Sequence, residues 1–359
     1  MKEIISASII IPIRNEAQYI KPCLFSVLSQ DYPSDRVEIL VVDGMSDDGT
    51  RMIVQQIIAN RFPATEPEPG SGYQENEVRP RMVLLDNPKR IVPSALNIGL
   101  TRARGEVILR IDGHCEIAPD YISRCVELLQ KTGADNVGGP LNTISDTLAG
   151  RAISLATSSA FGVGGVRFRC SAKPGWVDTV FPGAFPRQVF ERIGNFDEEL
   201  VRNQDDEFNF RLRQSGGKIW LDPSIKISYY ARSNFRGLWR QYLQYGFYKV
   251  RVIQKRGAVP SWRHLIPAAF VSGLASTLLL AVITGNPLWA LVVSGPYVAA
   301  NLFASLWAAR RDWRTLPLLP LAFLTIHFAY GAGFLWGLWS WRGFWGKGAA
   351  HRSNKVESS

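Results

Sequence analysis

Short apolar runs alternate with helix-like patterns in the first third of the chain. The apolar runs occupy residues 7–13, 37–42, 82–85 and 107–111, and helical patterns occupy 17–30, 50–59 and 93–104. Three of the runs end at an aspartate, namely Asp43, Asp86 and Asp112. This alternation predicts a parallel sheet covered by helices, and ligands of such sheets bind at the carboxyl ends of the strands.

The stretch from Glu106 to Glu116 (EVILRIDGHCE) carries the strongest candidate chemistry. Its apolar part predicts a buried strand, which places Asp112 and His114 at the carboxyl end. A carboxylate and an imidazole separated by one glycine can turn toward the same divalent cation. Taken alone, the stretch is better explained as a strand followed by a polar turn, and the other motifs of the chain reverse that preference.

Beyond residue 140 the pattern is mixed. Gly183 and Ala184 belong to a small-residue loop that would let the backbone approach a ligand. An acidic cluster at residues 205–207 precedes a helix expected from about 207 to 215, and a short strand is expected at 218–221. Acidic residues are favoured in the first turn of a helix, so the cluster also has a structural explanation.

The C-terminal third is apolar and basic. Residues 235–256 interleave aromatic and basic side chains, a pattern that suits a membrane interface or an ordinary packed amphipathic helix. Residues 265–309 contain no charge, and they predict membrane spans at 266–284 and 287–309. A third apolar segment occupies residues 316–341. It either is re-entrant or spans the membrane, and a span would place the basic tail outside, against the positive-inside rule.

Charge separates the two parts of the chain. Of the net +10, residues 232–263 contribute eight basic and no acidic side chains, residues 310–359 contribute +5, and residues 1–231 carry −3. This distribution favours an anionic membrane surface over nucleic acid as the partner. The four cysteines show no pair spacing and are expected to be reduced thiols. The chain contains no G-x-G-x-x-G or Walker lysine motif, which argues against a dinucleotide oxidoreductase and a P-loop NTPase.

Five ordered motifs together carry a family resemblance. They are IPIRNE at 11–16, VDGMSDDGT at 42–50, PSALNIG at 93–99, DGH at 112–114 and QDDEFNFRLR at 204–213. With them the chain resembles inverting family 2 glycosyltransferases of the GT-A fold, over roughly residues 6–256. It is similar to membrane-bound bacterial glucosyltransferases of succinoglycan-type exopolysaccharide synthesis. The resemblance implies an α/β nucleotide-diphospho-sugar transferase fold, with a mixed, mainly parallel sheet and a C-terminal transmembrane region.

The resemblance also implies a donor site. Pro12, Asn15 and Glu16 would line the base and ribose pocket, and Asp43 would contact the nucleotide. Gly44 stands where the family usually carries a second aspartate. Asn97 would contact the donor, or would cap or pack its helix. Asp47 and Asp48 are better explained as helix caps.

Asp112 and His114 occupy the position of the family's D-x-D motif, which implies a divalent cation, Mn²⁺ or Mg²⁺, that compensates the charge of the leaving diphosphate. Asp112 would contact the donor through this cation.

The resemblance nominates one carboxylate as the base that accepts the proton of the attacking hydroxyl. Alignment on Arg211 nominates Asp205, and alignment on the acidic pair would nominate Asp206 instead. Asp206, Glu207 and the loop of Gly183 and Ala184 are further candidates for contacts with acceptor or donor.

These observations predict a metal-dependent inverting transfer of one hexose, with glucose from UDP-glucose as the expected donor, to a lipid-linked oligosaccharide. No nucleic acid partner is expected. The string Q-x-x-R-W of processive synthases is absent, which favours single transfer. The alternatives are a polyprenyl-phosphate sugar transferase, a processive polysaccharide synthase and a catalytically silent membrane assembly subunit. The enzyme is expected in the bacterial inner membrane with its catalytic domain in the cytoplasm.

The expected domains are a catalytic domain at 1–231, an interfacial segment at 232–263, a transmembrane region at 264–341 and a basic tail at 342–359. The catalytic domain would comprise a nucleotide-binding half at about 1–115 and an acceptor half at about 116–231. Residues 61–81 are expected to form a surface loop.

Overall fold

A computed structural model describes residues 5–61, 80–170, 173–230 and 234–344. The chain forms two compact units. The sheet unit contains the described residues of Met1–Asn142 and Ser171–Tyr229, and the helical unit contains those of Thr143–Cys170 and Tyr230–Ser359. The predicted loop at 61–81 and the tail beyond residue 344 lie almost entirely outside the described residues.

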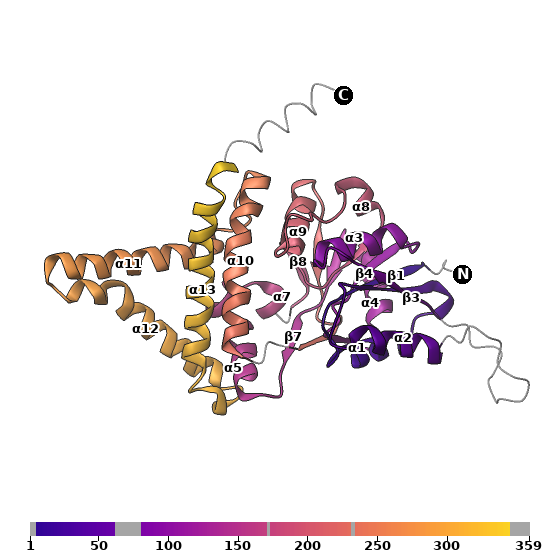
Figure 1. Cartoon of the computed structure of the whole chain (residues 1–359), viewed down its shortest axis with the longest axis horizontal. Coiled ribbons are helices and arrows are strands. Elements are labelled where there is room, and N and C mark those ends of the chain that lie inside the picture. Colours follow the sequence, from indigo (N-terminus) through magenta and orange to yellow (C-terminus); the bar gives the residue numbers. More distant parts are fainter. Residues whose placement is uncertain (1–4, 62–79, 171–172, 231–233, 345–359) are drawn as a thin grey trace, which may run out of the picture. The chain divides into compact units, whose positions relative to one another are not determined.

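The sheet unit is built on an eight-stranded mixed sheet with the order β3-β2-β1-β4-β9-β6-β10-β8 (Figure 1). Its strands are β1 (Ala7–Ile13), β2 (Val37–Asp43), β3 (Arg81–Asp86), β4 (Val107–Arg110), β6 (Asn136–Gly138), β8 (Gly175–Val177), β9 (Ala184–Pro186) and β10 (Ile219–Leu221). The first four are parallel neighbours, as the sequence predicts. Strands β5 (Cys115–Ile117), β11 (Ile227–Tyr230) and β7 (Leu141–Ile144) form a smaller sheet.

The strand register brings the carboxyl ends of the parallel strands to one edge. Ile13 pairs with Asp43, and Asp43 in turn pairs with Asp86. The strands are buried on both faces, which explains their continuous apolar sequences. The loops after these strands therefore start from a rigid edge.

Helices cover the sheet. They are α1 (Ile20–Leu28), α2 (Thr50–Arg61), α3 (Val92–Arg102), α4 (Tyr121–Thr132), α8 (Gln188–Ile193) and α9 (Gln204–Gln214), with a short 3₁₀ turn, η1 (Ser34–Arg36). Helix α9 begins three residues earlier than expected, at Gln204, so Asp205 lies in its first turn. Phe208 anchors this helix, because its fully buried ring stacks on Phe196 at 4.5 Å between centroids.

The helical unit contains the C-terminal helices and three short helices from the middle of the chain. Its elements are α5 (Leu148–Thr157), α6 (Ala160–Val163), α7 (Arg167–Cys170), α10 (Phe235–Arg256), η2 (Trp262–His264), α11 (Ile266–Thr284), α12 (Leu288–Ala309), η3 (Trp313–Thr315), α13 (Leu319–Ser340) and η4 (Arg342–Phe344). Three of them, α11, α12 and α13, are long and apolar enough to cross a membrane. Their positions match the three predicted segments closely.

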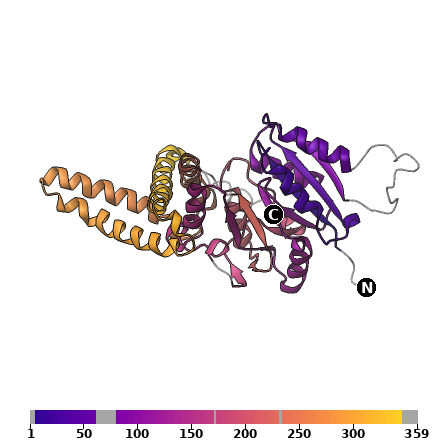
Figure 2. The same ribbon diagram turned by 90° about the horizontal axis from the view of Figure 1, so that it is seen from below.

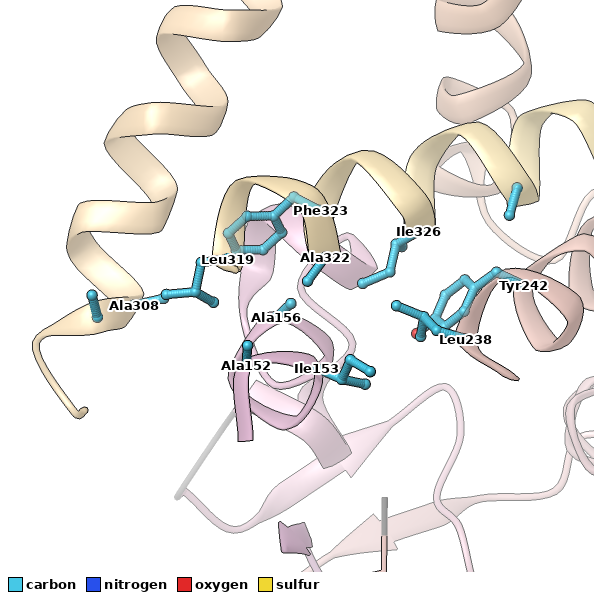
Figure 3. Close-up of a cluster of buried hydrophobic side chains, with 12 residues drawn as sticks. Ala152, Ile153, Ala156, Leu238, Tyr242, Ala308, Leu319, Ala322, Phe323 and Ile326 are labelled. Carbon is cyan, nitrogen blue, oxygen red and sulfur yellow. The ribbon is translucent and has the colours of Figure 1, made fainter. Parts of the chain in front are cut away.

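Residues 143–170 lie in the helical unit, although the sequence places them within a catalytic domain of residues 1–231. The reason is the core of this unit, where α5 contributes Ala152, Ile153 and Ala156 (Figure 3). These side chains pack with residues of α10 and α13, including Leu238 and Phe323. The apolar face of α5 is thus buried by helices that follow it by more than 80 residues.

Candidate active site

Two loops at the carboxyl edge of the sheet are joined by hydrogen bonds. Asn15, in the left-handed region with φ of 56°, donates from Nδ2 to Asp47 at 2.9 Å and accepts from the Asp47 backbone N–H at 3.1 Å. Asp48 accepts from the backbone N–H of Ala17 and of Thr50, the first residue of α2. Asp48 thus bonds the first turn of α2, as expected of a helix cap, whereas the bonds of Asp47 are with Asn15 and do not cap the helix. Together these bonds hold the loop of Glu16 against the loop that follows β2.

The pKa of Asp48 reflects these bonds. Burial raises the pKa of this carboxyl, but the hydrogen bonds from Thr50 and Ala17 outweigh burial, and the pKa lies below its ordinary value. The carboxylate is therefore a stable negative anchor between the two loops.

Asp43 is fully buried and already has hydrogen-bond donors. It accepts from Ser46 Oγ at 2.5 Å, and its Oδ2 lies 3.2 Å from Nη1 of Arg51. The same Nη1 lies 2.6 Å from Asp86. Arg51 thus joins the ends of β2 and β3, and the contact of Asp43 with a nucleotide stays a prediction.

Glu16 and His114 form a carboxylate–imidazole pair. Nδ1 of His114 lies 2.9 Å from Oε1 of Glu16, and the ring contacts Tyr229 edge-on at 4.6 Å between centroids. A Cβ at Gly113 would lie 2.7 Å from Ile13, so the turn between Asp112 and His114 requires glycine. Bonding of Nδ1 to a carboxylate fixes the tautomer and leaves Nε2 for a ligand.

Arg110, which the sequence analysis did not select, faces Asp112. Its Nε lies 2.9 Å from Oδ1 of Asp112, and Nη2 lies 3.3 Å from Oδ2. The side chain is buried, with its guanidinium 4.7 Å from the centroid of the Phe181 ring. A cation inside the apolar run VILRI was the available signal, because a buried arginine needs an anionic partner.

Asp205 lies in the first turn of α9, and its charge interacts with that of Arg110. Burial raises the pKa of Asp205, the positive charge of Arg110 lowers it, and Asp206 raises it, with a pKa above the ordinary value as the result. Burial lowers the pKa of Arg110, but Asp112 and Asp205 raise it above its ordinary value. One guanidinium therefore interacts with both the predicted metal ligand and the predicted base.

The comparisons with known proteins show the family of the chain. Residues 8–193 match the family described as Glycosyl transferase family 2. The chain belongs to glycosyltransferase family 2. It is 32% identical over 333 residues to the succinoglycan biosynthesis protein ExoA of Rhizobium meliloti (strain 1021), covering 92% of this chain and 94% of that protein.

Two further proteins resemble this glycosyltransferase over most of its length. The dolichyl N-acetyl-α-D-glucosaminyl phosphate 3-β-D-2,3-diacetamido-2,3-dideoxy-β-D-glucuronosyltransferase of Methanococcus voltae is 26% identical over 337 residues, covering 92% of this chain and 96% of that enzyme. The mannosyltransferase PcManGT from Pyrobaculum calidifontis, solved with GDP-Man and Mn²⁺, has a TM-score of 0.62 at 20% identity, covering 93% and 88% of the two chains. This likeness confirms the predicted GT-A fold.

The residues of this glycosyltransferase fit a divalent cation that is completed by substrate. Within the described ranges, no group of three or more histidine, cysteine, aspartate or glutamate side chains could hold a metal ion. Asp112 and His114 offer one carboxylate and one imidazole, and Glu16 orients the imidazole. A diphosphate oxygen is the kind of ligand that such a pair lacks.

Packing accounts for several of the other predicted positions. The Asn97 amide donates to Phe196 O at 2.9 Å and to Glu198 at 3.0 Å, which ties α3 to the loop before α9. Glu207 is fully buried and pairs with Arg211 at 3.0 Å, so it supports α9 from within. These contacts favour the packing alternative for Asn97 and give Glu207 a structural role.

The small residues 183 and 184 are buried in the sheet unit. A Cβ at Gly183 would lie 2.3 Å from Asn136, and Ala184 pairs with Leu109 inside the sheet. The carbonyl of Gly183 accepts from the backbone N–H of Arg110 at 3.1 Å. Pro12 is likewise buried in β1 opposite Val42. The small size of Gly183 is therefore required by packing, and substrate contacts of these three residues remain untested predictions.

Proposed function

We propose that this family 2 glycosyltransferase transfers one hexose from a nucleotide-diphosphate sugar to a lipid-linked saccharide, with inversion. The observation that carries the proposal is the shared guanidinium of Arg110, which pairs with Asp112 and interacts electrostatically with Asp205. A donor diphosphate and an acceptor hydroxyl must be brought together in this reaction, and the candidate group for each is close to the same cation.

Asp112 and Nε2 of His114 would hold Mn²⁺ or Mg²⁺, which when bound compensates the charge of the leaving diphosphate. Glu16 keeps the proton on Nδ1 and orients the ring through the 2.9 Å contact. The contact with Arg110 orients the carboxylate of Asp112 before the metal ion binds.

Asp205 would accept the proton of the acceptor hydroxyl as that oxygen attacks the anomeric carbon. One displacement inverts the anomeric centre and needs only one base. The charge of Arg110 lowers the pKa of Asp205 against the effect of burial and so favours the ionised form. In this proposal Arg110 is a positioning residue for both halves of the reaction.

The expected donor is UDP-glucose, on the family resemblance. A lipid-linked acceptor and a role in exopolysaccharide synthesis are supported by the names of two relatives, the succinoglycan protein ExoA and a transferase that acts on a dolichyl-phosphate sugar. The three apolar helices support a membrane location, which we propose to be the bacterial inner membrane with the catalytic unit in the cytoplasm.

The test is incorporation of labelled sugar into a membrane lipid extract from a panel of UDP- and GDP-sugars. Wild type should add one sugar, and Asp205→Asn should lose at least about 10²-fold in kcat, the lower end of what a general base contributes. Asp35→Asn, at an exposed site on η1, is the matched control and should remain active. A polymer ladder or a polyprenyl-phosphate sugar would support the respective alternative, and full activity of Asp205→Asn would exclude it as the base.

Folding of the variant can be checked independently. Because the folded-state pKa of Asp205 is raised, ionisation of this group disfavours the folded state at neutral pH. Asn cannot ionise, so the thermal midpoint of Asp205→Asn at pH 7 should equal or exceed that of the wild type. A large drop would show that the loss of activity comes from misfolding.

A further inference from the structure

Helix α13 packs against α10 along its whole length. The contacts advance in the same direction on both helices, with Leu243 against Gly333, Phe247 against Gly337, and Gln254 Nε2 donating to Trp341 O at 2.9 Å. A Cβ at Gly333 would lie 2.0 Å from Leu243 O, so the two backbones touch. Figure 1 shows the helices side by side. Because the two helices touch along their length, α10 and α13 must lie at the same depth in a membrane.

Helix α10 is poorly suited to the interior of a bilayer. It carries six basic and no acidic residues, namely Arg236, Arg240, Lys249, Arg251, Lys255 and Arg256. Each arginine or lysine at the centre of a membrane costs at least about 2.5–3.5 kcal/mol. Because α13 is packed to backbone contact with α10, it could cross the hydrocarbon only if the charged helix α10 crossed with it. The apolar composition of α13 is therefore not enough to predict that it spans the membrane.

The hairpin of α11 and α12 behaves differently. In the most apolar 18-residue stretch of each helix, 6% of the residues of α11 and 11% of those of α12 are buried inside the protein, compared with 56% for α13. Contacts of α11 with α13 include the base of the hairpin, where a Cβ at Gly331 would lie 2.3 Å from Pro267 O. In α12, Asn301 donates to Pro320 O, and the hydroxyl of Tyr297 lies 3.0 Å from Nδ1 of His327, about halfway along the helix. Figures 1 and 2 both show the hairpin projecting away from the pair α10–α13. The 19 residues of α11 span about 29 Å, close to the hydrocarbon thickness.

Aromatic and basic side chains mark the base of this hairpin. Trp262, Trp307 and Trp313 are 74%, 60% and 59% exposed there, and the basic neighbours are Arg263, Arg310, Arg311 and Arg314. Trp289 is exposed near the other end, at the start of α12. Tryptophan belts lie at both interfaces of a membrane, and arginine is favoured beside anionic headgroups.

The charge of the helical unit fits the same partner. Its described residues include fourteen arginine and lysine residues and only two acidic residues, Asp146 and Asp312. Asp312 is paired with Arg151 at 3.1 Å. An anionic lipid surface at the base of the hairpin would satisfy this excess of positive charge.

We infer that only the α11–α12 hairpin crosses the bilayer, and that α13 lies along the interface together with α10 on the side of the catalytic unit. The exposed large apolar side chains that α13 offers to the acyl boundary are Leu321, Leu324, Trp336, Leu338 and Trp339. No span then separates the end of α13 from the catalytic unit, and Arg342 at that end obeys the positive-inside rule. The topology does not depend on the reaction proposed above.

Single-cysteine labelling of the full-length protein tests this topology. Cys170 is the exposed cysteine among the described residues and is replaced by serine, and the buried thiols are kept. Asp35→Cys reports the catalytic unit, Asn286→Cys the hairpin tip, and Gly343→Cys the end of α13, where a Cβ meets nothing within 4 Å. A membrane-impermeant maleimide is applied to right-side-out and inside-out vesicles.

Positions 35 and 343 should be labelled in one vesicle orientation and position 286 in the other. Labelling of 343 together with 286 would show that α13 spans, and labelling of all three from one side would show that the hairpin does not cross. Either result would overturn the inference.

Depth measurements provide a second, independent readout. Nitroxides at Leu321→Cys and Trp339→Cys, near the two ends of α13, should lie at similar shallow depths in lipid nanodiscs, and Ala275→Cys in α11 should lie deepest. A spanning α13 would separate its two labels by about 27 Å along the membrane normal. A difference of that size would contradict the interfacial position.

Discussion

Arg110 connects the two predicted halves of the chemistry. Its guanidinium is buried, bonded to Asp112 through Nε and Nη2, and close enough to Asp205 to affect the pKa of that carboxyl. A buried arginine is costly unless an anionic group pairs with it, and Asp112 supplies that group. The charge of Arg110 also lowers the pKa of Asp205 against the effect of burial, which favours the ionised form of this predicted base.

Removing this charge should change the pH dependence of transfer. The base must be ionised, so activity is lost as the pH falls through the pKa of Asp205, which already lies above its ordinary value. In Arg110→Met that pKa rises further, and the acidic limb of the kcat profile should move to higher pH. Arg110→Lys keeps the charge and should show a smaller shift. An unchanged acidic limb of the kcat profile in Arg110→Met would show that Arg110 does not affect the pKa of the base.

Glu16 should control metal affinity through His114. Glu16→Gln weakens the anchor of the imidazole and should raise the metal concentration for half-maximal activity by about 10–100-fold. Glu127→Gln, at an exposed site on α4, is the control and should leave the metal titration unchanged. If Glu16→Gln altered the KM for the donor without altering the metal titration, a nucleotide contact would explain Glu16 better.

Among the elements, helices α9 and α13 are each held in place by particular packing residues. Helix α9 is held by the Phe208 ring and by the buried pair of Glu207 and Arg211, so that Asp205 is presented from a rigid first turn. Helix α13 is held by glycines that let α10 approach to backbone contact.

The contact between α10 and α13 should be sensitive to one methyl group. In Gly333→Ala the new Cβ would lie 2.0 Å from a backbone oxygen, so the helices must separate, at a cost of about 1–3 kcal/mol. Gly295→Ala in α12 is the matched control, because its Cβ meets nothing within 4 Å. Thermal unfolding in detergent should show a lower midpoint for Gly333→Ala alone, and equal midpoints would contradict the close packing.

For the whole molecule, the division into two units separates the residues proposed for the reaction from those proposed for membrane attachment. The sheet unit holds every residue proposed to contact the donor or to act as the base, and the helical unit carries the apolar hairpin and the excess of positive charge. Residues 143–170 belong to the helical unit and join its core through α5, and the described residues from 173 belong to the sheet unit again. The chain thus passes between the units three times, after Asn142, after Cys170 and near Tyr230.

The parallel strands and the residues at their ends were predictable from sequence. A strand buried on both faces requires a continuous apolar run, and such a run ends where the backbone meets solvent, so β1, β2 and β4 and the turns after them appear directly in the residue order. The apolar segments of α11 to α13 were equally evident, because length and composition alone mark a helix that can enter a membrane.

Tertiary structure decided which residues meet across the chain. The pairs of Glu16 with His114 and Arg110 with Asp112, and the interaction of Arg110 with Asp205, depend on strand order and on the start of α9, which local patterns do not encode. The packing of α13 also depends on tertiary structure. Its sequence is as apolar as a membrane span, but the structure packs it to backbone contact along the charged helix α10, and the inferred interfacial position of α13 rests on that contact.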